Sequence, residues 1–235
     1  MMAFRMKYDI TTAYLTGPSR RRPMIPLEPC RFLVAHDTGN PGSTAANNVT
    51  FYERTHNDME ASAHLFVDDR SIIECIPFLT APPEKAWHVR YDVVGDNIRY
   101  GTNANDAAGS IELCYGGSID MEEAYRRYCW TLAYACYLYG LNPATDLIGH
   151  YRLDPQRRTD PVGALALVGK TFDDLIIDVA AEYEASLEPD ILISPDDANK
   201  VIGFLSAAYF ATDDAQAQAE FHRLANELRR VSGQL

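Results

Sequence analysis

Four residues that lie far apart in the chain are of the types that build a hydrolytic metal site: His36, Glu112, His150 and Asp160. Two imidazoles and one carboxylate can hold a zinc ion through three protein ligands and leave its fourth position open for water. Zinc lowers the pKa of such a water to near neutrality and makes it a strong nucleophile. A carboxylate that is not a ligand, here Glu112, can then move protons as general base and general acid. If the four side chains converge, the chemistry they predict is amide hydrolysis.

Each of the four residues lies where a strand, or the loop after it, would present a side chain at the edge of a sheet. The apolar run before His36 is typical of a buried strand, which ends on this residue. Glu112 lies in a stretch whose apolar and polar side chains alternate, as they do along a half-buried strand. His150 follows a short apolar stretch, and Asp160 lies in the loop beyond it. Strand ends and the loops after them commonly position the ligands of an open catalytic metal site.

Six short segments repeat a known order and spacing of motifs over about residues 28–182. They are Val34-Ala-His-Asp-Thr38, Ser62-Ala-His-Leu-Phe-Val-Asp-Asp69, Ala86-Trp-His88, Ser110-Ile-Glu112, Gly149-His150 and Arg158-Thr-Asp-Pro161. Together they resemble the zinc-dependent N-acetylmuramoyl-L-alanine amidases, which are phage and bacterial enzymes related to the peptidoglycan recognition proteins. Because six segments agree in order and spacing, the resemblance is far more specific than any single motif.

The resemblance implies a role for each motif residue. It implies that His36, His150 and Asp160 bind Zn²⁺, that Glu112 shuttles protons, and that Arg158 lies beside the scissile carbonyl and stabilises the oxyanion. It also implies substrate contacts for His64, Trp87 and His88.

The chain departs from the family pattern at three places. Many phage members have Cys at the third ligand position, where this chain has Asp160, so its site is harder and less thiophilic. Arg158 stands where Lys is common, and it keeps its charge under all conditions. The A-W-H motif usually continues with Ala-Gly, whereas residues 89–91 are Val-Arg-Tyr, which changes the expected substrate contacts and leaves the metal site unaffected.

The function expected from the resemblance is hydrolysis of the amide bond between N-acetylmuramic acid and L-alanine in peptidoglycan, for host-cell lysis. Three alternatives stay open: a non-catalytic peptidoglycan-binding module, a regulatory partner protein, and a recycling amidase that acts on soluble muropeptides. Relatives that bind peptidoglycan without cutting it lack the third ligand, so the presence of Asp160 favours an enzyme.

Composition limits the partners and the compartment. The 235-residue chain has a net charge of −12 and no basic face, which argues against a nucleic-acid partner. The negative charge is also unfavourable toward anionic wall polymers, and the short basic cluster 20–22 is too small to offset it. No stretch approaches the ~20 apolar residues that span a bilayer, and no secretory start is present. Five scattered cysteines without a CxxC pair indicate free thiols of a reducing cytoplasm. We therefore expect synthesis in the cytoplasm and action on the cell wall after release, or after export by a route that the sequence does not reveal.

The expected fold class is α/β, with a mixed central β-sheet flanked by helices as in the amidases and peptidoglycan recognition proteins, and with a C-terminal helical hairpin. Helices are predicted over 43–57, 120–139 and 171–183, a β-hairpin over 62–77 and mostly irregular structure over 78–108. The predicted domains are a proline-rich arm (1–30), a zinc amidase catalytic domain (31–186) and the hairpin (190–235). A hairpin of this size buries little core alone, so we expect it to pack on the catalytic domain, to bind the wall or to form a homo-oligomer.

Overall fold

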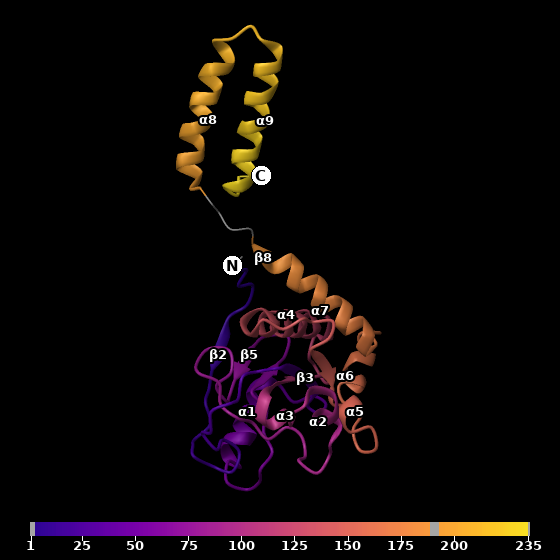
Figure 1. The fold of residues 1–235 in the computed structure, drawn as a ribbon. Coiled ribbons are helices and arrows are strands. Elements are labelled where there is room, and N and C mark those ends of the chain that lie inside the picture. Colours follow the sequence, from indigo (N-terminus) through magenta and orange to yellow (C-terminus); the bar gives the residue numbers. More distant parts are fainter. Residues whose placement is uncertain (1–2, 189–192, 235) are drawn as a thin grey trace. The chain divides into compact units, whose positions relative to one another are not determined.

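The computed structural model of the protein describes residues 3–188 and 193–234 (Figure 1). The chain divides into two compact units. The larger is Met6–Ser186, and the smaller combines Met1–Arg5 with Leu187–Leu235. The larger unit contains all the residues of the predicted metal site.

Most of the predicted arm and the whole predicted catalytic domain lie in the larger unit. Residues 6–30 belong to the larger unit, which also contains the predicted catalytic domain. Parts of the predicted arm and hairpin, namely residues 1–2, 190–192 and 235, lie outside the described residues.

A six-stranded mixed sheet forms the centre of the larger unit, with the strand order β2-β5-β4-β6-β3-β7. Strands β4, β6, β3 and β7 pair in parallel, β5 pairs antiparallel with β4, and β2 pairs in parallel with β5. This confirms the expected mixed sheet. The strands are β2 (Ile10–Thr12), β3 (Phe32–Asp37), β4 (Leu65–Val67), β5 (Ile72–Glu74), β6 (Ala108–Leu113) and β7 (Leu147–Gly149).

Helices cover both faces of this sheet, as Figure 1 shows. Helix α4 packs on β3, β4 and β6 from one side and α7 packs on α4, whereas α1 and α3 contact the sheet strands from the other side. The helices are α1 (Ala45–Arg54), α2 (Gly95–Tyr100), α3 (Ala104–Ala107), α4 (Met121–Tyr139), α5 (His150–Leu153), α6 (Val162–Ala166) and α7 (Phe172–Ser186).

Capping residues mark where the helices begin and end. The Asp120 side chain accepts a hydrogen bond from the backbone N–H of Glu123 and starts α4, and Gly140 ends it with a φ of 66° that favours glycine. Both ends were predicted correctly. Thr44 caps α1, one residue after the predicted start of this helix at Ser43. The segment 78–108 was expected to be mostly irregular, but it also contains the short helices α2 and α3.

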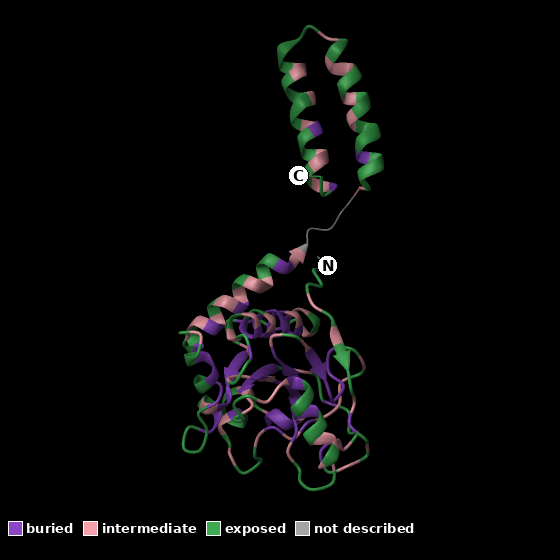
Figure 2. Ribbon diagram, turned by 180° about the vertical axis from the view of Figure 1, so that it is seen from behind, coloured by how far each residue is buried: buried purple, intermediate pink, exposed green. Residues whose placement is uncertain are grey.

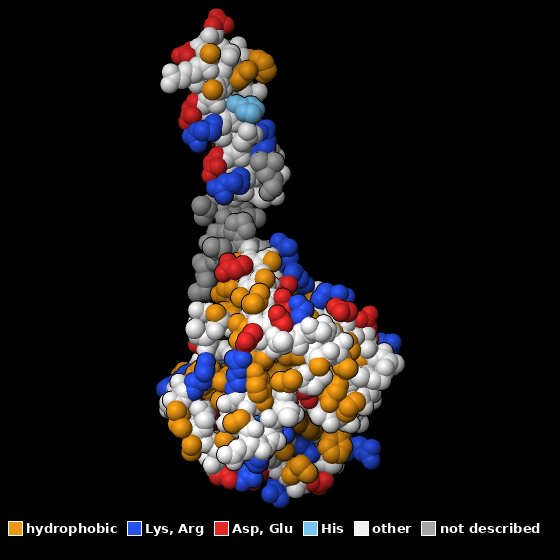
Figure 3. All heavy atoms as spheres, turned by 90° about the vertical axis from the view of Figure 1, so that its right-hand side faces the viewer, with side chains coloured by type: hydrophobic (Ala, Val, Ile, Leu, Met, Phe, Trp, Pro, Cys, Tyr) orange, Lys and Arg blue, Asp and Glu red, His pale blue; other side chains and the backbone are white. Residues whose placement is uncertain are grey.

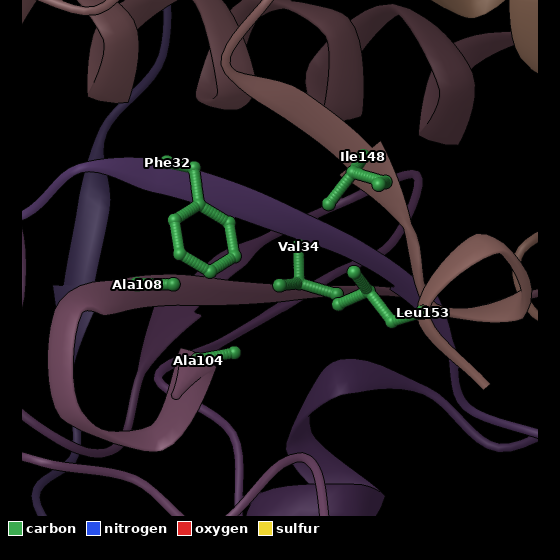
Figure 4. Close-up of a cluster of buried hydrophobic side chains, with 6 residues drawn as sticks. All are labelled: Phe32, Val34, Ala104, Ala108, Ile148 and Leu153. Atoms are coloured by element: carbon green, nitrogen blue, oxygen red, sulfur yellow. The ribbon is translucent and has the colours of Figure 1, made fainter. Parts of the chain in front are cut away.

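Alternating side chains on β3 assign the two faces of the sheet. Phe32 and Val34 point to one face and join an apolar cluster with residues of α3, β6, β7 and α5, drawn in Figure 4. Figure 2 shows that most of the sheet is buried, whereas the edge strand β2 is partly exposed. Because His36 follows in the same alternation, its side chain lies on the face of this cluster, at the end of the strand. The members of the cluster are Phe32, Val34, Ala104, Ala108, Ile148 and Leu153.

The smaller unit is a helical hairpin of α8 (Pro195–Phe210) and α9 (Ala215–Val231), together with a two-stranded pairing of β1 (Ala3–Phe4) and β8 (Leu187–Glu188). The side chain of Asp214 caps α9. The predicted hairpin is confirmed, and its role in wall binding or self-association stays a prediction. Across the residues that the structure describes, no helix has the length and apolar character needed to cross a membrane.

Charged side chains are mixed on the surface of the larger unit. On the face that Figure 3 displays, basic and acidic side chains are interspersed and not gathered into areas of one sign. Of the predicted basic cluster 20–22, Arg21 is buried and the Arg22 side chain is only 13% exposed. The cluster is therefore not a basic surface patch, because two of its three side chains point into the fold.

Candidate metal centre

Three adjacent parallel strands bring the candidate residues to one edge of the sheet. His36 lies near the end of β3 and is paired in register with Glu112 of β6. On the other side of β3, Ala35 is paired with Gly149, so that His150 follows directly at the end of β7. In open α/β sheets, the carboxyl ends of parallel strands are where sites are built.

The predicted ligand atoms lie in contact with one another. The distance from His36 Nδ1 to Asp160 Oδ2 is 2.9 Å, and from His150 Nδ1 to the same oxygen it is 3.1 Å. The two Nδ1 atoms are 3.2 Å apart. Tetrahedral ligands at the usual zinc distances are separated by about 3.3 Å. The spacing of the three atoms therefore fits one small divalent cation.

A chain of hydrogen bonds sets the tautomer of His36. The carbonyl of Ala104 can only accept, so His88 donates to it through Nε2, at 3.2 Å. Neutral His88 therefore accepts at Nδ1, and it does so from His36 Nε2 at 3.2 Å. With its proton on Nε2, neutral His36 presents a bare lone pair at Nδ1, toward the other two ligand atoms. Neighbours that orient a ligating histidine in this way are a usual part of metal sites.

The electrostatics keep the ligand set ready for a cation. Burial lowers the pKa of His36 to about 4, despite the opposing effect of Asp160, so its ring is neutral near pH 7. Burial alone would raise the pKa of the Asp160 carboxyl, but the facing imidazoles of His150 and His36 outweigh it and hold this pKa below its ordinary value. One ionised carboxylate and neutral imidazole suit zinc or a similar ion.

Glu112 stands beside the three ligand atoms without belonging to the set. Burial raises its pKa well above the ordinary value, and the negative charges of Asp160 and Asp37 add to this effect. Among the described residues, its buried Oε2 and the buried Thr38 Oγ1 have no hydrogen-bond partner. Because buried polar atoms are nearly always paired, both indicate a site that receives a polar ligand.

A cavity of about 280 Å³ is lined by His36, Asp160, Glu112 and Thr38, among others. Arg158 lines it, with Nε 4.0 Å from Asp160 Oδ1 and a side chain that is 49% exposed. Its neighbour Arg157 also lines the cavity but forms an ion pair with Asp154. The guanidinium of Arg158 is therefore available to a molecule bound in the cavity.

The three residues predicted to contact substrate lie in different places. Trp87 is half-buried and lines the cavity. His88 lines it too, but its ring nitrogens contact His36 and Ala104. His64 is fully buried and does not belong to the cavity lining. Substrate contact stays a prediction for all three.

His64 holds two segments together as a neutral ring. Its Nε2 donates to the carbonyl of Glu84 at 2.8 Å, and its Nδ1 accepts from the backbone N–H of Ser110 at 3.0 Å. A second proton on Nδ1 would break the bond to Ser110. Accordingly, burial lowers the pKa of His64 to about 4.

The two hydrogen bonds of neutral His64 predict that protonation of this residue destabilises the fold at low pH. Its folded pKa of about 4 lies below the unfolded value of about 6.5, so the unfolded chain takes up the proton first. The stabilisation is complete above about pH 6.5 and is lost as the pH falls toward 4, a difference of about 3 kcal/mol. In urea unfolding with a chelator present, His64→Asn should be less stable at pH 7 and lose less stability at pH 4.5 than the wild type. An equal loss in both proteins would contradict this role.

Two cavity residues carry roles that the sequence reasoning did not assign. Tyr52, which lies in the helix predicted over 43–57, lines the cavity. Ser62 fixes the backbone of Trp87, because its Oγ accepts from the Trp87 N–H at 3.0 Å and its own N–H donates to the Trp87 carbonyl at 2.8 Å. The place of Ser62 in the motif segment 62–69 could have indicated its role. Nothing in the apolar pattern of the helix distinguishes Tyr52 from a core residue.

The chain is similar to known amidases in sequence and in fold. The family model described as N-acetylmuramoyl-L-alanine amidase matches residues 26–163. Among curated proteins, N-acetylmuramoyl-L-alanine amidase BlyA of Bacillus subtilis (strain 168) is 29% identical over 151 residues, or 60% of this chain. The chain spans only 39% and 44% of the length of the curated relatives that it matches.

Solved structures share the fold of the larger unit. The catalytic domain of XlyA superposes with a TM-score of 0.59 at 20% identity, over 73% of this chain and 99% of that chain. A mutant endolysin from Bacillus subtilis superposes with a TM-score of 0.57 at 19% identity, over 73% of this chain and 98% of that chain. These likenesses confirm the fold class expected from the sequence.

Proposed function

Because this chain belongs to the N-acetylmuramoyl-L-alanine amidase family, we propose that it hydrolyses the amide bond between N-acetylmuramic acid and L-alanine in peptidoglycan. The observation that carries the proposal is the convergence of His36, His150 and Asp160 beside Glu112, under one cavity. Two imidazoles and one carboxylate at tetrahedral spacing support Zn²⁺ as the resident ion, since catalytic zinc sites use three protein ligands.

In this proposal the protein's own side chains divide the work. The bound zinc ion supplies Lewis acidity to a carbonyl oxygen and lowers the pKa of water. Glu112 takes the proton of the attacking water and returns it to the leaving amine, a task suited to a carboxyl whose pKa is raised by burial. The guanidinium of Arg158 donates to the carbonyl oxygen as negative charge develops there. His88 holds His36 in the tautomer that can bind the ion.

Product analysis on purified sacculi tests the reaction. We expect new free amino groups of L-alanine, no new reducing sugar ends, and one zinc ion per chain by mass spectrometry. New reducing ends would indicate cleavage of the glycan strand and would reject the amidase. Binding to sacculi without any new end group would instead indicate a non-catalytic binding module.

Substitution of Arg158 tests oxyanion stabilisation. Removal of one such donor typically costs about 10²–10³ in kcat, and because this side chain is half-exposed we expect Arg158→Ala to lose about 10². Arg158→Lys keeps the charge but not the planar fork, so it should lose less than Arg158→Ala. Rates on a soluble muropeptide, with zinc content measured in parallel, check this order. Equal rates for the wild type and Arg158→Ala would remove Arg158 from the reaction.

We propose host-cell lysis as the setting, with the enzyme acting on the cell wall after release from the cytoplasm. The similarity of the larger unit to an endolysin supports this setting. A comparison of rates on intact sacculi and on soluble muropeptides separates it from recycling, because a lytic enzyme should prefer sacculi. A strong preference for soluble fragments would favour recycling.

A further inference from the structure

The segment 18–23, which precedes the family-matched residues 26–163, is held firmly on the larger unit. The buried guanidinium of Arg21 donates from Nε to the carbonyl of Thr55 at 3.0 Å. Arg22 forms a two-point ion pair with Glu84, at 2.8 and 2.7 Å. Since both arginines point inward, the surface of this segment has a defined position and can contribute to a binding site.

This segment forms one wall of a second pocket, of about 420 Å³, that adjoins the catalytic cavity. Trp87 lines both the catalytic cavity and the second pocket. Glu60 lines the second pocket, and the next residue along the chain, Ala61, lines the catalytic cavity. A ligand that fills the catalytic cavity can therefore extend past Trp87 into the second pocket. Besides Trp87, the lining residues are Pro18, Ser19, Arg20, Pro23, Asn57 and Glu60.

The lining has the chemistry of a saccharide site. An aromatic ring offers a flat face to the C–H side of a sugar, and Arg20, Asn57 and Glu60 offer planar polar groups for hydroxyl and acetamido groups. The Arg20 guanidinium lies 3.9 Å from the Glu60 carboxylate, with both side chains more than half exposed. The pocket thus has no excess positive charge, which a stem peptide rich in carboxylates would require.

We propose that this pocket is a glycan subsite, which binds the N-acetylglucosamine unit next to the N-acetylmuramic acid in the catalytic cavity. The inference rests on the proposed function, and it goes further by assigning part of substrate recognition to residues that precede the family-matched region. It makes the enzyme selective for muropeptides that retain their glycan.

Tryptophan fluorescence tests the subsite directly. The chain has two tryptophans, and Trp130 is fully buried, so a ligand in the pocket is reported by Trp87. The probe is chitotriose, a trimer of N-acetylglucosamine that has no lactyl group or peptide to be cleaved. We expect a saturable change in the wild type, and a dissociation constant raised about tenfold or more in the double variant Arg20→Ala/Asn57→Ala, which removes two hydrogen-bonding side chains.

A matched control uses an arginine outside the pocket. Arg70→Ala removes a side chain that is 86% exposed and should bind chitotriose as the wild type does. Circular dichroism of each variant checks that it is folded. Absence of any response to millimolar chitotriose in the wild type, or equal affinity in the double variant, would overturn the subsite. A response to a sugar-free stem peptide that the double variant loses would assign the pocket to peptide and would also overturn it.

The outcome is separable from that of the proposed function. Hydrolysis of sacculi without chitotriose binding would reject the subsite and keep the amidase. Chitotriose binding without hydrolysis would reject the amidase and keep a glycan-binding pocket.

Discussion

Glu112→Gln is expected to lower kcat by about 10²–10⁴-fold, the usual contribution of a general acid–base group, while the zinc content stays at the wild-type level. The amide keeps the shape of the carboxyl but cannot accept a proton from water. Metal binding should survive, because Glu112 is not among the three clustered ligand residues. Steady-state rates on a soluble muropeptide and metal analysis of the same preparation check both parts.

The matched control for this variant is Glu122→Gln, which neutralises an exposed carboxylate at the start of α4. It should retain wild-type turnover. Full turnover in Glu112→Gln would show that another group moves the protons. Loss of zinc in Glu112→Gln would instead make Glu112 a ligand and would require a different general base.

The parts of the fold that the sequence predicted are those governed by local patterns. The apolar run before His36 became β3, because a strand buried on both faces is recognisable by composition alone. Helix α4 was predicted to both ends, because Asp120 and Gly140 are capping residues whose effect depends on the nearest turn. The parallel pairing of β3 with β6 and β7 then brings His36, Glu112 and His150 to one edge of the sheet.

The parts that escaped prediction depend on contacts between distant segments. Arg21 reads as a surface charge, but its guanidinium lies 4.3 Å from the ring centroid of Tyr52 and is buried against α1. His64 reads as a substrate contact, and only the fold reveals that Glu84 and Ser110 occupy both of its ring nitrogens. Neither arrangement leaves a periodic signal, because each is set by the approach of a loop or strand from elsewhere in the chain.

His150→Ala is expected to abolish zinc binding, which would lower the measured content from one ion per chain to almost none. Two ligands, His36 and Asp160, remain in this variant, whereas a catalytic zinc site usually has three protein ligands. Binding at 100 times the dissociation constant stabilises a fold by about 2.7 kcal/mol, which for a domain of this size raises Tm by roughly 5–10 °C. Added zinc should therefore raise the Tm of the chelator-treated wild type and leave that of His150→Ala unchanged.

Two further substitutions separate the loss of a ligand from a general loss of structure. His222→Ala removes an exposed histidine of α9 and should keep both the zinc and the rise in Tm. Asp160→Cys replaces an oxygen ligand by a thiolate, which zinc also accepts, so zinc should still bind. The softer ligand should, however, weaken binding of manganese relative to zinc, because manganese prefers oxygen ligands. If His150→Ala kept one zinc ion per chain, the ion would have to be held by side chains other than those at the ends of β3 and β7. If Asp160→Cys left the preference between the two metals unchanged, Asp160 would not be a ligand.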